Sequence, residues 1–127
     1  MFRSLDFIYA PTRNADEELS FCTKILGGEA VFSIRAFDTR VAAVRFGEGP
    51  LLLLAEHLEG ERPILIFRVD DFHEAVKSMK DRGIKGEQLE IPHGPCYSFR
   101  TAGGQRLAIY ELQRPEMNAH FAGRLDP

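Results

Sequence analysis

The segment LDFIYAPTRNADEELSFCTKILGG (residues 5–28) combines the signals of a strand, a turn and a helix. Apolar residues are dense before Pro11, and proline ends such a run because it cannot donate to a sheet. Asn14 is a favoured helix N-cap, and Glu17 stands three residues later as its capping-box partner. Apolar side chains then recur at helical spacing up to Gly27. The segment therefore predicts one strand followed by one helix.

The same order of signals returns in ILIFRVDDFHEAVKSMKDRG (residues 64–83). Asp71 takes the N-cap position with Glu74 three residues later, and Gly83 ends the helical pattern. The strand positions 7 and 64 and the caps 14 and 71 share one offset of 57 residues. A duplicated module is the simplest explanation, although βαβ-rich α+β domains also produce such matches by chance.

β-rich stretches separated by turn signals fill the rest of each half. They are residues 29–37, 40–46 and 51–57 in the first half, and residues 88–91, 96–101 and 106–112 in the second. The predicted fold class is α+β, with two tandem βαβββ modules in a single domain, residues 1–127. The modules span about residues 1–58 and 62–112, and a polar tail (113–127), with one helical turn, lies on the surface or caps a neighbour.

Composition and charge exclude several classes of protein. The 127 residues are 44% hydrophobic and 28% charged, which is typical of one globular domain. The longest apolar runs are about five residues against the roughly 20 that cross a bilayer, and no apolar segment follows Met1. We therefore expect a cytoplasmic protein that does not bind membranes. The formal net charge of −3, without long single-sign blocks, gives no sign of nucleic-acid binding.

Few patterns in the chain point to catalytic chemistry. Cys22 and Cys96 are far apart and lack CxxC or Cys/His ligand spacing, which favours reduced cysteines that serve packing. No two histidines have the i, i+4 or HxH spacing of a ligand pair. Ser98 and Cys96 are strand residues with no base identified nearby in the sequence. We predict no catalytic residue and no cofactor.

Three motifs resemble those of the vicinal-oxygen-chelate superfamily, which includes glyoxalase I, extradiol dioxygenases, fosfomycin-resistance enzymes and bleomycin-binding proteins. They are the opening strand LDFI (5–8), the helix end LSFCTKILG (19–27), similar to FYxxxLG, and FRTAGG (99–104), similar to FxDPDG. The last motif lacks the Asp and Pro of the family's turn, but paired glycines still allow a turn. The resemblance covers residues 1 to about 112 and implies that each module curls into a half-barrel cup, as in the glyoxalase/bleomycin-resistance fold.

The resemblance also implies four metal-ligand positions, one on the first and one on the last strand of each module. In this chain all four are apolar and offer no lone pair to a metal: Phe7, Leu53, Ile64 and Ala108. We therefore predict no metal site. On regular strands the neighbouring carboxylates Asp6, Glu56 and Glu111 face away from the cup, although a bulge would change that. His57, four residues after Leu53, stays open as an atypical ligand.

Strand alternation predicts which side chains face the cup, because residues two apart lie on one side of a strand. The predicted wall is aromatic and aliphatic, with Arg62 and Arg106 as cations for a carboxylate or phosphate. The candidate ligand-binding residues are Phe7, Tyr9, Leu53, His57, Arg62, Ile64, Ile66, His93, Tyr97, Phe99, Arg106, Ala108 and Tyr110. The alternative is that these aromatic residues fill a collapsed core.

A concave apolar wall with a few polar groups favours binding of a small molecule. By resemblance to the bleomycin-resistance members, the leading hypothesis is a metal-free protein that binds a partly hydrophobic antibiotic or metabolite. The cleft would be shared by two subunits of a symmetric homodimer. The main alternative is a lyase, isomerase or dioxygenase with no metal or with unfamiliar ligands such as His57, Glu56 or His93. A third hypothesis is a module with a filled cup that acts through its surface.

Overall fold

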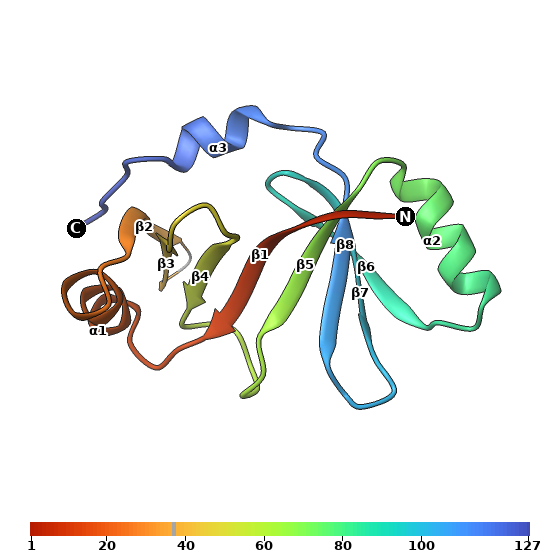
Figure 1. Cartoon of the computed structure of the whole chain (residues 1–127), viewed down its shortest axis with the longest axis horizontal. Coiled ribbons are helices and arrows are strands. Elements are labelled where there is room, and N and C mark those ends of the chain that lie inside the picture. Colours follow the sequence, from red (N-terminus) through yellow and green to blue (C-terminus); the bar gives the residue numbers. More distant parts are fainter. Residues whose placement is uncertain (37) are drawn as a thin grey trace.

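The computed structural model describes residues 1–36 and 38–127, so the predicted end of one strand at residue 37 lies outside the described residues. Within these described residues, eight strands and three α-helices follow the predicted order (Figure 1). The first half contains β1 (Phe2–Pro11), α1 (Ala15–Ser20) with its π-helical extension η1 (Phe21–Ile25), β2 (Glu29–Ala36), β3 (Thr39–Arg45) and β4 (Leu51–Ala55). The second half contains β5 (Ile64–Val69), α2 (Phe72–Asp81), β6 (Gly86–Ile91), β7 (Gly94–Arg100), β8 (Arg106–Tyr110) and α3 (Glu116–Phe121).

The strands form one curved sheet in the order β2-β3-β4-β1-β5-β8-β7-β6. Each module has the same internal pairing, because β1 runs parallel to β4 and β5 runs parallel to β8. The modules join where β1 pairs antiparallel with β5, and Ile8 faces Leu65 there, 57 residues apart. The predicted offset therefore marks a quasi-two-fold axis that relates the two modules. The predicted α+β fold of two tandem βαβββ modules is confirmed.

The helices α1 and α2 begin where the sequence predicts, and two side chains cap the N-terminus of each. Asn14 accepts a hydrogen bond from the Glu17 N–H at 3.0 Å, and Asp71 accepts one from the Glu74 N–H at 3.1 Å. A carboxylate that follows the last strand of each module binds the first helical N–H group. Glu56 accepts from Ala15 and Glu111 accepts from Phe72, both at 2.9 Å. These two carboxylates therefore face away from the cup, as predicted.

The end of the first helix differs from the prediction of a regular α-helix. The Leu26 N–H bonds to the Phe21 carbonyl, five residues back, at 3.2 Å. The Thr23 hydroxyl donates to the carbonyls of Leu19 and Ser20, and such side-chain bonds compete with the helical ladder. The last turn is therefore a widened π-helical turn.

The two faces of the sheet have different partners. The α1 cluster on the convex face joins Ala15 and Cys22 to Ala42, Val44 and Leu54. The α2 cluster comprises Val69, Phe72, Ala75, Val76, Met79, Tyr97 and Ile109. The concave face carries a third cluster, which includes Phe7, Phe32, Ile66, Ala108 and Tyr110. The concave cluster is the floor of the cup.

The tail folds back over the cup of its own chain. We call residues 113–127 the strap, and α3 arches above the strands of the first module in Figure 1. Beyond α3 the strap pairs with the edge strand β2, because the Ser33 N–H donates to Arg124 and the Ser33 carbonyl accepts from Asp126, both at 2.8 Å. Within residues 1–36 and 38–127, no helix is long and apolar enough to cross a membrane.

Candidate functional site

A cavity of about 1100 Å³ lies between the concave face of the sheet and the strap. Its walls come from both modules, and Phe121 of the strap packs against the same core cluster. Nine of the predicted ligand-binding residues line it: Phe7, Tyr9, Leu53, His57, Ile64, Ile66, His93, Ala108 and Tyr110. The cup is therefore hollow, and its aromatic residues do not fill a collapsed core.

Arg62 and Arg106 do not face the cup, and the predicted orientation of both is wrong. They line a separate hollow of about 370 Å³. The Arg106 guanidinium donates to the carbonyls of Glu59 and Arg62, and the Arg62 guanidinium donates to that of Gly103. Strand alternation fails for Arg62 because β5 begins only at Ile64, and Arg106 is the first residue of β8. Their side chains tie together the loops at the strand ends.

Tyr97 and Phe99 are also misplaced by the prediction, because they lie on the convex face. Tyr97 is buried under α2 and donates a hydrogen bond from its phenol to the Ile84 carbonyl at 3.1 Å. Phe99 packs against the same cluster. The alternate residues of β7, Cys96 and Ser98, line the cavity instead. Burial raises the pKa of the Cys96 thiol to about 11, so this thiol is a weak nucleophile near neutral pH.

The four positions that the resemblance assigns to metal ligands all line the cavity, and each carries only carbon atoms: Phe7, Leu53, Ile64 and Ala108. Among residues 1–36 and 38–127, no three His, Cys, Asp or Glu side chains stand where they could hold a metal ion together. The residues present therefore do not fit the metal that the fold would imply, because hard and borderline cations need N or O donors.

Asp6 faces the cavity, and the prediction that it faces away is wrong. Leu5 pairs with Phe67 and Phe7 with Ile66, so Asp6 is an extra residue in β1 without a partner on β5. Such a bulge changes which side of the strand the neighbouring side chains occupy. Leu5, Asp6 and Phe7 consequently all line the cavity. No residue type in the sequence marks this bulge.

The Asp6 carboxylate is the centre of a polar group in the wall. It accepts hydrogen bonds from the hydroxyls of Ser4 and Tyr110, both at 2.5 Å. The Arg68 Nε atom lies 3.7 Å from the same carboxylate. Burial and the hydrogen bond to Asp6 raise the pKa of the Tyr110 phenol far above its ordinary value. Prediction from sequence missed Ser4, Asp6 and Arg68.

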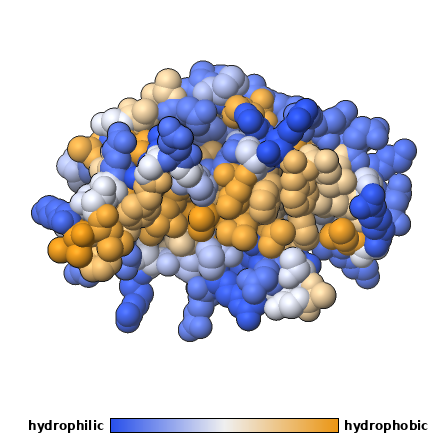
Figure 2. All heavy atoms as spheres, viewed as in Figure 1, coloured by the Kyte–Doolittle hydropathy of each residue, from blue (hydrophilic) through white to orange (hydrophobic). Residues whose placement is uncertain are grey.

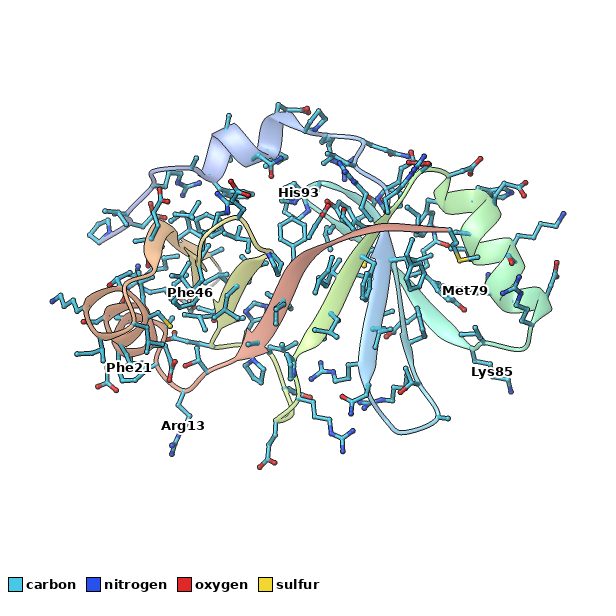
Figure 3. The ribbon with its side chains drawn as sticks, viewed as in Figure 1. Arg13, Phe21, Phe46, Met79, Lys85 and His93 are labelled. Atoms are coloured by element: carbon cyan, nitrogen blue, oxygen red, sulfur yellow. The ribbon has the colours of Figure 1, made fainter. Side chains whose placement is uncertain are left out.

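His93 belongs to the turn between β6 and β7 and connects the sheet to the strap (Figure 3). Its Nε2 atom lies 2.9 Å from Oδ1 of Asn118, an acceptor, which places the ring proton on Nε2. The imidazole also packs on Phe7, with ring centroids 5.1 Å apart. Desolvation lowers the pKa of His93, which favours the neutral form of the ring. Asn118 was not predicted because its strap is far away in sequence.

His57 lies beyond the end of β4 and lines the cavity with Tyr9. Its Nε2 atom lies 2.8 Å from the Tyr9 hydroxyl, and burial raises the pKa of that phenol. This pair is a further polar group of the cavity. Within the described residues, His57 belongs to no group of three His, Cys, Asp or Glu side chains that could hold a metal ion.

No protein-family model and no curated protein sequence matches the chain. Its structure is similar to a methylmalonyl-CoA epimerase from Mycobacterium tuberculosis, with a TM-score of 0.73, 16% identity and 93% of each chain covered. A Streptomyces coelicolor methylmalonyl-CoA epimerase superposes with a TM-score of 0.72 at 15% identity, over 90% of this chain and 97% of that one.

A catechol 2,3-dioxygenase superposes with a TM-score of 0.66 at 16% identity, and the match covers 87% of this chain but 41% of the dioxygenase. The epimerases and this dioxygenase share the vicinal-oxygen-chelate architecture. Likeness at this level of identity concerns the fold, since one fold supports many activities. The chain therefore has the vicinal-oxygen-chelate fold, with apolar side chains at the positions that the resemblance assigns to metal ligands.

Proposed function

We propose that the protein binds a partly hydrophobic organic molecule, an antibiotic or a metabolite, in its cup without a metal. One observation carries this proposal: a cavity of about 1100 Å³ whose four expected metal-ligand positions are apolar. Small-molecule sites are commonly concave, largely apolar and supplied with a few placed polar groups. The groups around Asp6, His93 and His57 fit that description. Binding of this kind would resemble that of the bleomycin-resistance proteins.

The metal-free part of the proposal is tested by elemental analysis. Protein produced in medium supplied with iron, manganese, nickel and zinc should carry only substoichiometric metal, equal to that of a chelator-treated control. One tightly held metal per chain would contradict the proposal and would direct attention to His57 and His93. The test needs no knowledge of the ligand.

We also propose a cytoplasmic homodimer. Phe21, Ile25 and Leu26 are 50%, 70% and 55% exposed on η1 and directly after it. Hydrophobic residues gather at this end of the molecule in Figure 2. Clustered exposed apolar side chains favour burial against another protein surface. Sedimentation analysis should give a dimer, and Ile25→Lys should shift it to monomer; a monomeric wild-type protein would contradict this.

A metal-free enzyme is the second candidate, because Asp6 and His93 place possible proton acceptors at the cavity. The epimerases of the same fold make methylmalonyl-CoA a reasonable first substrate. NMR in D₂O would detect exchange of its α-proton. Exchange that is lost in Asp6→Asn would favour catalysis over binding alone, whereas exchange equal to the protein-free rate would favour binding.

A further inference from the structure

We infer that the molecule bound in the cup carries a carboxylate, and that Arg68 holds it. This inference rests on the proposed function, because it assigns the chemistry of a ligand to the same cavity. It also assigns to Arg68 the anion-binding role predicted from sequence for Arg62 and Arg106, which lie outside the cup.

Arg68 stands at the polar end of the cavity wall. It lies on β5, between Ser4 of β1 and Tyr110 of β8 in the sheet register. Its side chain lines the cavity and is 42% exposed. A cation in this position is accessible to a ligand that rests on the apolar floor.

The hydrogen-bonding capacity of Arg68 is largely unused. A guanidinium has five N–H donors and no acceptor. Its contact with Asp6 is 3.7 Å long, which exceeds a hydrogen bond, and no other ion pair or hydrogen bond of its side chain is found in residues 1–36 and 38–127. Water must therefore satisfy these donors when the cavity contains no ligand.

A ligand that fills the cavity removes this water from the Arg68 guanidinium. A purely apolar ligand would displace water from the guanidinium without replacing its hydrogen bonds, and an unsatisfied desolvated charge is costly. A carboxylate supplies two acceptor oxygens in the geometry that a guanidinium prefers. The vacant donors of Arg68 therefore favour an anionic ligand over a neutral one.

Asp6 is a poorer partner for a cationic ligand. Both of its oxygens already accept a hydroxyl hydrogen bond at 2.5 Å, from Ser4 and Tyr110. Arg68 also compensates its charge at 3.7 Å. Two of the roughly four acceptor sites of the carboxylate are thus occupied, whereas the Arg68 side chain makes no hydrogen bond within the described residues, so this end of the cavity has more unused donors than unused acceptors. A ligand ammonium would also meet the Arg68 cation.

Three probes with one fluorophore test this inference: dansylglycine (anionic), dansylamide (neutral) and dansylcadaverine (cationic). Wild-type protein should bind dansylglycine about tenfold more tightly than dansylamide, which corresponds to about 1.4 kcal/mol. Dansylcadaverine should bind no more tightly than dansylamide. Arg68→Gln should remove the preference, so that dansylglycine and dansylamide bind with equal affinity, and Arg68→Lys should retain part of the preference because it keeps the charge.

Two further arginine variants locate the charge effect. Arg13, which points away from the cavity in Figure 3, is the matched control for loss of one positive charge, and Arg13→Gln should keep the full preference. Arg45 is the other arginine of the lining, at the exposed end of β3. Loss of the preference in Arg45→Gln but not in Arg68→Gln would overturn the assignment to Arg68. Tighter binding of dansylcadaverine than of the other two probes to wild-type protein would also overturn it.

The cavity variant Ala108→Trp separates this inference from the proposed function. Ala108 lies on the floor of the cup, and an indole there would obstruct the cavity. Weaker binding of all probes to Ala108→Trp, together with equal preferences in wild type and Arg68→Gln, would refute only the role of Arg68. Unaltered probe binding by Ala108→Trp would refute the cup as the binding site.

Discussion

The Tyr110 phenol on β8 donates a hydrogen bond to the Asp6 carboxylate on β1, 104 residues away in sequence, at 2.5 Å. The bond crosses β5, which separates these strands in the sheet, and so ties the two modules together on the concave side. It also fixes the polar end of the cavity, where Arg68 stands. Stability and the proposed ligand binding therefore involve the same group of residues.

Tyr110→Phe should destabilise the protein by about 2 kcal/mol at pH 7, because a hydrogen bond to a charged group is lost from a buried site. The pKa of Tyr110 is raised in the folded state, so its contribution is fully present below pH of about 10. As pH rises from there toward the folded-state pKa, the unfolded state loses its proton first and stability falls. Urea unfolding of both proteins between pH 8 and 11 measures the difference.

The variant should show a shallower alkaline loss of stability than wild type. Raised pKa values of Tyr9, Cys22 and Cys96 also contribute to that loss, but they are common to both proteins and cancel in the comparison. Parallel curves for wild type and Tyr110→Phe would show that the phenol does not titrate with folding.

His93→Gln should reduce the acid sensitivity of the fold. Desolvation lowers the folded-state pKa of His93, so below pH of about 6.5 the unfolded state takes up the proton first. Stability is therefore lost as pH falls through that range toward the folded-state pKa. Glutamine still can donate to Asn118 but does not titrate. Chemical unfolding at pH 7 and pH 5 measures the effect, with His73→Gln, an exposed position on α2, as the control that keeps the wild-type loss.

Arg40→Met should release the end of the strap. The buried Arg40 guanidinium donates to the Ser33 hydroxyl and to the backbone oxygens of Asp126 and Pro127, at 2.9 to 3.0 Å. Loss of these bonds should cost about 2 kcal/mol and speed amide hydrogen exchange at residues 123–126. Protection of those amides equal to wild type would show that the β2 edge holds the strap without Arg40.

Glu56→Ala and Glu111→Ala should each cost about 1 kcal/mol of stability, because each removes an acceptor from the first N–H of a helix. The two sites belong to different modules, so the double variant should lose the sum. Glu59→Ala, exposed in the loop after β4, is the matched control and should change stability by less than about 0.5 kcal/mol. A loss of stability in only one of the two single variants would contradict the equivalence of Glu56 and Glu111.

Local sequence signals predicted the fold well. The caps Asn14 and Asp71 begin helices as expected, and the 57-residue offset recurs as the pairing of Ile8 with Leu65. These features succeed because capping and strand alternation are decided by neighbouring residues. Alignment of the strands with those of the resembling family also predicted that the four expected metal-ligand positions are apolar.

The remainder of the site depends on contacts that local patterns do not contain. The bulge that turns Asp6 toward the cavity is a property of the β1–β5 pairing. The face of the sheet that Tyr97 occupies depends on how β7 pairs with its neighbour β8. The strap is placed by Arg40, 86 residues from Asp126 in sequence. Cavity-lining residues from elements distant in sequence, such as Asn118, were therefore missed.

The most direct test of the proposed binding site is the affinity of dansylamide for wild-type protein, Ala108→Trp and the control Ala102→Phe, measured by fluorescence titration in chelator-containing buffer. Ala102 is exposed in the turn between β7 and β8, so its variant adds an aromatic group outside the cup. The expected result is saturable binding to wild type and Ala102→Phe without metal, and at least about tenfold weaker binding to Ala108→Trp. Equal affinity of all three proteins, or binding that requires an added metal, would contradict metal-free binding in the cup.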